Sequence, residues 1–290
     1  MLLQKKRAII TGGSMGLGLA IAKAFVAQGA SVVVCARDSV ALENTLEELR
    51  AIPGNDRQTI RAHVCDVSDE SQVDQLFAQA LEAMGGLDIL VNNAGVYGPK
   101  GSVEELDRSE WRQAIETNLF GTLYTCQKAI AIFKQHARGK VINMSGGGAT
   151  APLPFISAYS ASKAAVVRLT ETLSEEVKQF GIDINAVAPG ALNTRLMEEV
   201  LEAGPEKVGE SFFHATIRQQ ESGGTSLDKG AQLCVFLASA ASDGITGKLI
   251  SAVWDSWPEF NDHRIDIETT DIYTLRRIVP KDRGMDWETL

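Results

Sequence analysis

The sequence predicts an α/β fold, namely a doubly wound parallel sheet of about seven strands with helices on both faces. Two observations predict it. Short apolar segments alternate along the chain with segments of helical periodicity, and a glycine-rich turn joins the first apolar segment directly to the first helical one. With 290 residues, 44% of them hydrophobic, the chain can bury a full core. We expect residues 1–257 to form a single domain and residues 258–290 to form an extension.

The candidate strands are short and rich in apolar and β-branched residues, as buried strands usually are. They span residues 7–11, 31–36, 60–66, 87–92, 140–145, 183–188 and 248–253, and helical patterns fill most of the gaps between them. In an open parallel sheet the ligand binds beyond the carboxyl ends of the strands. The residues that follow these segments are therefore the first candidates for a functional site.

The first strand runs without a gap into Thr11-Gly12-Gly13-Ser14-Met15-Gly16-Leu17-Gly18, and a helical pattern follows. In such a turn Gly12 permits the tight bend, Gly16 lets the backbone approach a pyrophosphate, and Gly18 lets the helix pack on the strand. The free N–H groups at the start of the helix attract phosphate. Because strand, turn and helix occur together, they predict a Rossmann-type dinucleotide site rather than an ordinary turn.

A second signal lies far downstream, where Tyr159 and Lys163 are four residues apart. On a helix such residues share one face, so the ammonium lies near the phenol. A nearby cation favours the ionised phenol and is expected to move the pKa of Tyr159 from about 10 toward the working pH. With the glycine turn present, we interpret the pair as a catalytic acid and base. The alternative is an exposed tyrosine and lysine on an amphipathic helix.

The motifs, in their order, resemble those of the classical short-chain dehydrogenase/reductases. They are Thr-Gly-x-x-x-Gly-x-Gly at 11–18, Asp66, Asn92-Asn93-Ala94-Gly95, Asn118, Tyr159-Ser160-Ala161-Ser162-Lys163 and Pro189-Gly190, and the likeness covers residues 5–254. The resemblance implies an enzyme that interconverts a carbonyl and a secondary alcohol by hydride transfer, with Tyr159 as general acid/base. It also implies that Lys163 binds the nicotinamide ribose and that Asn118 holds a water in a proton relay. A nucleotide-binding protein with weak or lost catalysis, serving a regulatory or scaffolding role, is the alternative.

The same resemblance assigns cofactor contacts by position. Asp66 and Val67 correspond to an adenine contact, Asn93 and Gly95 to the adenosine-ribose wall, and Leu192 and Thr194 to carboxamide contacts. The full set implied is Gly12, Ser14, Met15, Gly16, Leu17, Gly18, Arg37, Asp66, Val67, Asn93, Gly95, Tyr159, Lys163, Pro189, Gly190, Leu192 and Thr194. For Asn92 a structural role, tying neighbouring loops together at a strand end, is a strong alternative.

The end of the second strand bears on the choice between NAD and NADP. An NAD enzyme places a carboxylate there to bind the ribose hydroxyls, whereas this chain has Ala36 followed by Arg37, which can pair with a 2′-phosphate. We therefore predict NADP(H), with NAD(H) as the alternative. Two features favour the alternative: Asp38 would reach a ribose if the loop shifted, and Met15 replaces a basic residue common in NADP enzymes.

One position departs from the family pattern. Relatives usually carry a serine thirteen residues before the tyrosine, and this chain has Gly146 there, with Ser145 one place earlier. A shift of one residue in a strand turns a side chain to the opposite face, so Ser145 replaces the serine only if the strand end bulges or turns. Alternatively Thr150 or a backbone N–H stands in, or the donor is missing and the enzyme is slow. We predict Ser145 as the fourth catalytic residue, after Tyr159, Lys163 and Asn118.

Substrate specificity is expected to lie in residues 191–225, with help from 97–105 and 150–157. The long segment has the mixed polarity of a mobile lid with a Gly223-Gly224 hinge, and its notable side chains are Met197, Phe212, Phe213, His214 and Arg218. For the two phenylalanines core packing is at least as good an interpretation, and His214 receives no role. The sequence does not distinguish an oxoacyl thioester, a steroid, a sugar or a small ketone as the carbonyl or alcohol substrate.

Composition limits the partners. The net charge of −9 and the absence of a basic run disfavour nucleic acid, and no apolar stretch is long enough to cross a membrane. The four cysteines form no CxxC pair, so we expect reduced core thiols, no metal site and a cytoplasmic location. The family resemblance implies a homodimer or homotetramer built from helices around 107–137 and 157–180. The apolar residues after 253, among them Trp254 and Tyr273, predict that the extension packs on its own domain over the active-site rim, or on a neighbouring subunit.

Overall fold

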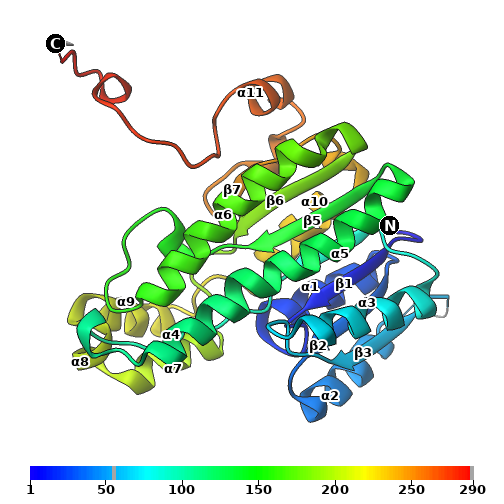
Figure 1. Ribbon diagram of the computed structural model, residues 1–290, viewed down its shortest axis with the longest axis horizontal. Helices are drawn as coiled ribbons and strands as arrows, with labels where there is room; N and C mark the ends of the chain where they lie inside the picture. Colours follow the sequence, from blue (N-terminus) through cyan, green and yellow to red (C-terminus); the bar gives the residue numbers. More distant parts are fainter. Residues whose placement is uncertain (54–56, 288–290) are drawn as a thin grey trace.

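The computed structural model describes residues 1–53 and 57–287. Within them, seven parallel strands form one sheet in the order β3-β2-β1-β4-β5-β6-β7, with helices on both faces (Figure 1). The strands are β1 (Arg7–Thr11), β2 (Ser31–Ala36), β3 (Ile60–Val64), β4 (Ile89–Asn92), β5 (Gly139–Met144), β6 (Ile182–Ala188) and β7 (Leu249–Ser251). The predicted fold class is confirmed. The predicted bounds of β1 and β2 are met, and those of the other strands differ by at most two residues at either end.

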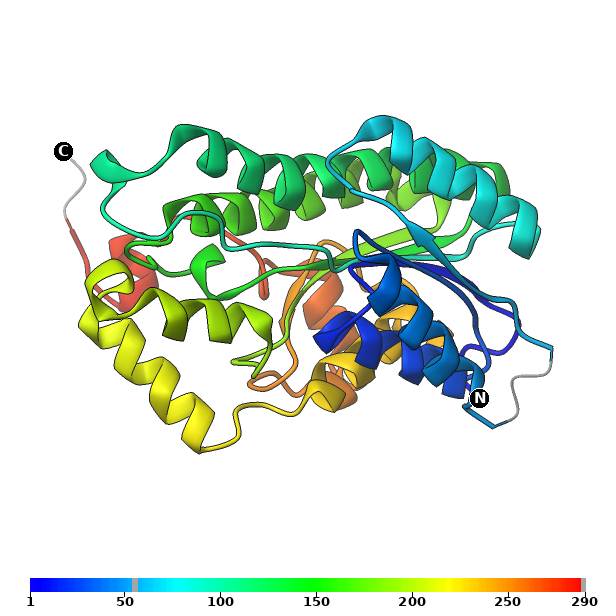
Figure 2. The same cartoon turned by 90° about the horizontal axis from the view of Figure 1, so that it is seen from below.

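Alternation along each strand divides the core into two layers. Ile10, Val32 and Val34 belong to one cluster, while Ile9 and Val33 belong to the other, because successive side chains point to opposite faces of a sheet. The first face is covered by α1 (Gly16–Ala27), α2 (Ser39–Arg50) and α10 (Leu227–Ala238); the second by α3 (Glu70–Met84), α5 (Gly121–His136) and α6 (Ser157–Val177), with α4 (Arg108–Ile115) leading into α5. Figure 2 shows the sheet edge-on between these layers.

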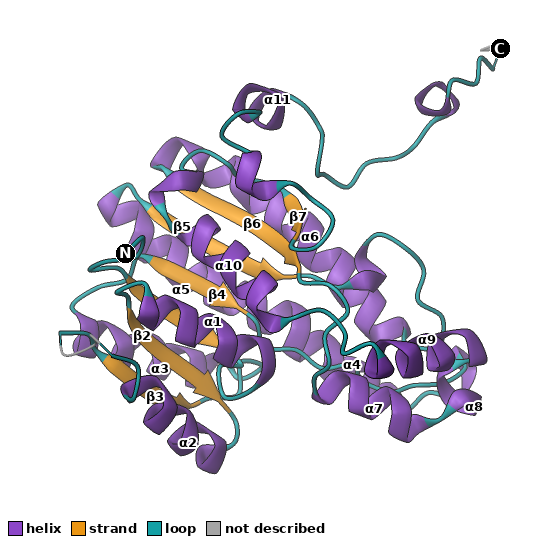
Figure 3. Cartoon of the chain, turned by 180° about the vertical axis from the view of Figure 1, so that it is seen from behind, coloured by secondary structure: helices purple, strands orange, loops and turns teal. Residues whose placement is uncertain are grey.

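The segment predicted as a lid is helical. It contains α7 (Arg195–Ala203), α8 (Pro205–Val208) and α9 (Glu210–Glu221), which lie together beyond the carboxyl ends of the strands (Figure 3). A parallel bridge between Leu192 and Thr225 joins the two ends of the segment at its base, and the Thr225 N–H donates to the Ala191 carbonyl at 2.8 Å. The segment is thus a helical cap with a closed base, and Gly223 and Gly224 both adopt positive φ where it returns to the body.

The C-terminal extension divides into two parts. Up to Leu275 it lies on the body: Phe260 and Ile267, the latter in α11 (Arg264–Thr269), are buried in the same cluster as α1 and α10, and the Trp257 ring lies 5.6 Å from that of Phe236. Beyond Leu275 the chain runs away from the domain (Figure 1), and Trp287 is 70% exposed. In the single chain, the extension therefore packs on the domain only up to Leu275.

Within the described ranges, no helix combines the length and apolarity needed to cross a bilayer. All four cysteines are buried and free. In the same part of the chain, no cluster of His, Cys, Asp and Glu side chains has the arrangement of a metal site.

Candidate active site

A cleft of about 1180 Å³ opens at the carboxyl ends of the strands and brings most of the predicted residues together. Only Gly18 and Asn118 of the predicted set do not line it. Those that do are Gly12, Ser14, Met15, Gly16, Leu17, Arg37, Asp66, Val67, Asn93, Gly95, Ser145, Tyr159, Lys163, Pro189, Gly190, Leu192 and Thr194. The cleft thus joins residues from one end of the chain to the other in a single concave surface.

The glycine turn has the conformation that its sequence requires. Gly12 and Gly16 have φ of +61° and +53°, which only glycine adopts readily. A Cβ on Gly18 would lie 2.1 Å from the Gly12 carbonyl oxygen, so this glycine lets α1 pack against the turn and does not face the cleft. The Asn93 amide donates to the carbonyl oxygens of Thr11 and Gly12 at 3.1 and 2.9 Å and holds the turn from the other side.

The first turn of α1 differs from those of its neighbours. Asp38, Asp69 and Asp107 cap α2, α3 and α4 through their carboxylates. At the start of α1 the capping position is Met15, which makes no side-chain hydrogen bond, and the first turn contains no acidic residue. Its N–H groups therefore lack the side-chain acceptor that α2, α3 and α4 have, and they face the cleft where an anion would bind. The residues of this turn fit the pyrophosphate of a dinucleotide.

The end of β2 presents Arg37 to the cleft with its side chain 56% exposed and 3.9 Å from the Asp66 carboxylate. Asp38 is used differently, because one of its oxygens accepts from the N–H groups of Val40 and Ala41 at 2.9 and 3.1 Å. Its carboxylate is therefore committed to capping α2. This arrangement fits an adenosine ribose that carries a phosphate better than one that carries a free hydroxyl.

Tyr159 and Lys163 lie on the buried side of α6 with 8% and 5% of their surfaces exposed. The Lys163 ammonium donates to the Met144 carbonyl at 2.8 Å and lies 5.8 Å from the centre of the Tyr159 ring. Tyr97 packs edge-on against Tyr159, with ring centres 4.7 Å apart. The predicted pair therefore shares one face of the helix, and an aromatic neighbour fixes the phenol in place.

The charge environment of this pair differs from the expectation. Burial raises the pKa of Tyr159, and repulsion from Tyr97 adds to the effect, so the expected fall in its pKa is wrong for the protein without a bound cofactor. The cost of desolvating a phenolate outweighs the attraction of an ammonium that is itself bonded to a carbonyl. Burial also lowers the pKa of Lys163 to about 8.

The strand end around Gly146 does not bulge. The Ser145 N–H continues the sheet by donating to the Val187 carbonyl at 2.8 Å, and Gly146 is extended with φ −171° and ψ 173°. The turn begins only at Gly147. The bulge that would carry Ser145 into the place of residue 146 is therefore absent, although the Ser145 hydroxyl lies at the cleft, buried and without a hydrogen-bond partner among the described residues.

Gly146 is instead in close contact with the catalytic candidate. A Cβ added at this position would lie 2.0 Å from the Tyr159 hydroxyl oxygen. Because Gly146 has no side chain, the Tyr159 hydroxyl can occupy the space that a Cβ would fill. Thr150, the other side chain that the sequence offers in place of the usual serine, is exposed and lines the cleft.

Asn118 is fully buried beside the cleft, in a π-helical turn, 116–120, that leads into α5. Its carbonyl oxygen accepts from the Val96 N–H, and its amide donates to the Val96 carbonyl, both at 2.8 Å, and to the Ser162 hydroxyl at 2.9 Å. The side chain fastens the segment after β4 to the helix that carries Tyr159. Asn92 likewise bonds Asn143 and Thr125, in line with its structural interpretation.

Several cleft residues escaped the sequence analysis. Tyr97 lies within a range predicted for the substrate, but nothing in its spacing singled it out. Trp254, Asp255 and Tyr273 come from beyond β7 and also line the cleft. Trp254 and Tyr273 belong to the apolar residues that the sequence predicts to pack over the active-site rim or a neighbouring subunit, whereas no local pattern marks Asp255. Of the side chains noted in the cap, Met197 and Phe212 line the cleft, whereas Phe213, His214 and Arg218 do not.

Comparison with known proteins agrees with this geometry. The family profile described as short chain dehydrogenase matches residues 6–204. A 3beta-hydroxysteroid dehydrogenase 1 of Eggerthella lenta is 40% identical over 207 residues, which cover 70% of this chain and 77% of that protein. An L-fucose dehydrogenase of Bos taurus is 35% identical over 237 residues, covering 82% of this chain and 84% of the relative.

Among solved structures, a single-residue variant of actinorhodin polyketide ketoreductase with NADPH has a TM-score of 0.77 and is 29% identical. The alignment covers 85% of this chain and 95% of that one. Because these relatives act on a steroid, a sugar and a polyketide according to their names, similarity at this level does not identify a substrate.

Proposed function

This chain belongs to the short-chain dehydrogenase family, and on that premise we propose that it is an NADP(H)-dependent oxidoreductase that interconverts a carbonyl and a secondary alcohol. The observation that carries the proposal is the position of Tyr159 and Lys163, which are buried at the cleft formed by the dinucleotide-type turn. A bound NADPH supplies the hydride for such a reaction. The chain supplies binding, orientation and a proton.

The proton comes from the Tyr159 hydroxyl. Because its pKa is raised, the phenol stays protonated at neutral pH and donates to the oxygen of a substrate carbonyl. Lys163, charged below pH about 8, stabilises the phenolate that this donation leaves behind. The protonated phenol of Tyr159 and the charged ammonium of Lys163 both favour reduction at neutral pH.

The cofactor would be held by the uncapped N–H groups of α1 on its pyrophosphate and by Arg37 on a 2′-phosphate. Asp66 and Val67 would lie at the adenine, and residues 189–194 at the nicotinamide end. Lys163 would bind the nicotinamide ribose when that group is present. NAD(H) is the weaker candidate, because the carboxylate nearest to a ribose at the end of β2 caps a helix instead.

The test is a panel of carbonyl compounds, namely an aryl ketone, a steroid ketone, an oxoacyl thioester and a sugar, incubated with the full chain and NADPH or NADH. We expect turnover of at least one ketone, faster with NADPH. A matched Tyr159→Phe variant should bind NADPH as the wild type does and fail to turn over. If no carbonyl compound of the panel is reduced although NADPH binds, the result contradicts the enzyme assignment.

That outcome would favour a second function, a nucleotide-binding protein of this fold with weak or lost catalysis. The specific observation in its favour is Gly146, because the usual donor to the substrate oxygen is missing and Ser145 does not replace it by a bulge. Loss of one such donor slows acyl-transfer enzymes by about 10²–10³, so a slow enzyme is the intermediate case.

We also propose a cytoplasmic homodimer or homotetramer, formed through the outer faces of α5 and α6. Two observations support this proposal: the Phe120 ring at the start of α5 is 37% exposed, and the reduced, buried cysteines suit a reducing compartment. Light scattering of the purified chain would measure the subunit number, and a mass of one subunit at micromolar concentration would contradict the assembly.

A further inference from the structure

The segment of residues 270–275, here called the strap, runs along the free edge of β7, the last strand of the sheet. The Leu249 N–H of β7 donates to the Tyr273 carbonyl at 2.8 Å. Next to it, the Lys248 ammonium donates to the carbonyls of Thr270 and Ile272 at 2.9 and 3.1 Å. The strap thus satisfies an edge that would otherwise present unpaired groups.

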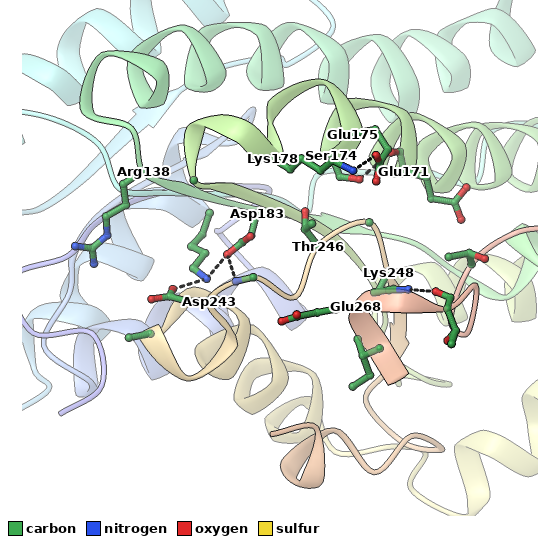
Figure 4. Close-up of a pocket in the computed structure, with 18 of the residues that line it drawn as sticks. Arg138, Glu171, Ser174, Glu175, Lys178, Asp183, Asp243, Thr246, Lys248 and Glu268 are labelled. Atoms are coloured by element: carbon green, nitrogen blue, oxygen red, sulfur yellow. Dashed lines mark hydrogen bonds and ion pairs between the residues drawn. The ribbon is translucent and has the colours of Figure 1, made fainter. Parts of the chain in front are cut away.

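A second anchor comes from α6. The Glu171 carboxylate accepts from the Leu275 N–H at 2.6 Å, and Arg168 pairs with Glu171 at 2.6 Å while its guanidinium donates to the Leu275 carbonyl. Glu171 and Lys248 are 9% and 6% exposed, and Figure 4 labels both among the residues of a second cavity, of about 940 Å³. All these bonds go to backbone groups of the strap. They fix the path of its backbone and leave its side chains available for contacts with the cleft.

Two strap side chains extend toward the candidate active site. Leu275 packs with Ala149 and Val167, directly beside the turn at Gly147–Ala149 that follows Gly146. Tyr273 lines the cleft itself. Burial raises the pKa of the Tyr273 phenol, and the nearby Asp255 carboxylate adds to the effect.

Several contacts position Tyr273 there. Its backbone has φ +59°, an uncommon value for a residue with a side chain, and its ring lies 5.3 Å from that of Phe260. An uncommon conformation is maintained only where the surroundings determine it. Here the carbonyl bond to Leu249 and the anchors on both sides of the strap do so. The strap also lies outside residues 6–204, which the family profile matches.

We propose that Tyr273 is a specificity-determining residue, forming a wall of the cleft against which the apolar body of a bulky carbonyl or alcohol substrate lies. The inference rests on the proposed function and adds the substrate class to it. Besides Tyr159, the aromatic side chains of Tyr97, Phe212, Trp254 and Tyr273 line the cleft, and Trp254 is 77% exposed at this surface. Such a lining favours an extended aryl or polycyclic ketone over a small polar one.

The first experiment compares Tyr273→Ala and Tyr273→Phe with the wild type on a polycyclic ketone and on a small aliphatic ketone. For the polycyclic ketone, Tyr273→Ala should raise KM about tenfold, the loss of one stacked aromatic contact, and leave kcat within about twofold. Tyr273→Phe should behave as the wild type. The matched control is Ile278→Ala, which removes an exposed side chain beyond the strap.

The second experiment removes one anchor of the strap without touching the strap's side chains. Lys248→Met deletes both bonds to the strap carbonyls, leaves the anchors at Leu249 and Glu171 in place, and should raise KM for the polycyclic ketone selectively, by less than Tyr273→Ala does. The melting temperature and the NADPH affinity identify a variant that has simply lost its fold. An equal change for both ketones, or no change in a folded Tyr273→Ala protein, would overturn the inference.

Ligand binding separates this inference from the proposed function. Titrating the wild-type chain and Tyr273→Ala with the polycyclic ketone in the presence of NADP⁺, followed by tryptophan fluorescence, needs no turnover. A higher Kd for the ketone in Tyr273→Ala than in the wild type supports the role of Tyr273, even if neither protein turns the ketone over. Equal binding contradicts that role even where wild-type turnover has established the enzyme.

Discussion

The cofactor side of the cleft and its C-terminal wall are built in different ways. Between β1 and β4, each contributing residue lies within a few positions of a strand end, and the Asn93 side chain that holds the glycine turn follows β4 immediately. The C-terminal wall depends on contacts between distant residues, such as Glu171 with Leu275, which are 104 positions apart. Local motifs therefore indicate a candidate cofactor site, whereas the wall that we propose to select a substrate is assembled only in three dimensions.

The largest expected effect in this comparison comes from removing the proposed proton donor, Tyr159, which a local motif predicts. Tyr159→Phe keeps the ring that packs against Tyr97 and deletes only the hydroxyl. We expect kcat for ketone reduction to fall by about 10²–10⁴, the usual contribution of a positioned acid, with NADPH affinity unchanged. Steady-state kinetics and a fluorescence titration measure the two quantities, and a variant that keeps a rate close to that of the wild type would contradict the role.

Arg37 tests how well a local motif specifies the cofactor. Arg37→Ala removes an exposed guanidinium at the end of β2, and the loss of a charge-assisted bond corresponds to about 10–100-fold in affinity. We expect the Kd for NADPH to rise by this factor while the Kd for NADH stays nearly unchanged. Equal changes for both would show that the 2′-phosphate is bound elsewhere.

Gly146 lies where the two regions meet, and its substitution sharpens the comparison. Restoring the family residue with Gly146→Ser places a Cβ 2.0 Å from the present position of the Tyr159 hydroxyl. We therefore expect kcat to fall about tenfold, a modest loss for overpacking beside a reacting group, rather than to rise. A gain in kcat would show that the phenol moves aside easily and that the chain only lacks a donor. Gly147→Ser is the matched control, because a Cβ on that glycine meets nothing within 4 Å.

The smallest effect concerns pH. Burial lowers the pKa of Lys163 to about 8, so its ammonium is charged below this value and becomes neutral above it. The rate of ketone reduction should therefore decline several-fold as the pH rises through about 8, since the phenolate left on Tyr159 loses its stabilising cation. A pH–rate profile checks this, and Lys163→Met should show a lower rate with no step in that range.

The fold was largely predictable because strands and helices alternate and each strand is apolar along its length. The glycine turn, Arg37 and the Tyr159–Lys163 pair were predictable for a similar reason, since each depends on a spacing of a few residues. The pKa of Tyr159 was not, because the desolvation that raises it comes from residues distant in sequence. Neither was the geometry at Ser145, where the hydrogen bond to Val187 and the extended backbone of Gly146 show that the strand continues without a bulge. Tyr273 and Trp254 were indicated only as apolar residues of an extension expected to pack, because no spacing assigns either side chain to a place in the cleft.

The most direct test of the central claim is isotope transfer from NADPH deuterated at the nicotinamide C4. We predict that the wild-type chain, incubated with a ketone that it reduces, places the deuterium on the carbinol carbon of the product, and that Tyr159→Phe binds the same cofactor yet yields no labelled alcohol. If the wild-type protein binds NADPH but forms no labelled alcohol from any ketone of the panel, or if Tyr159→Phe transfers the label at the wild-type rate, the proposed chemistry is contradicted.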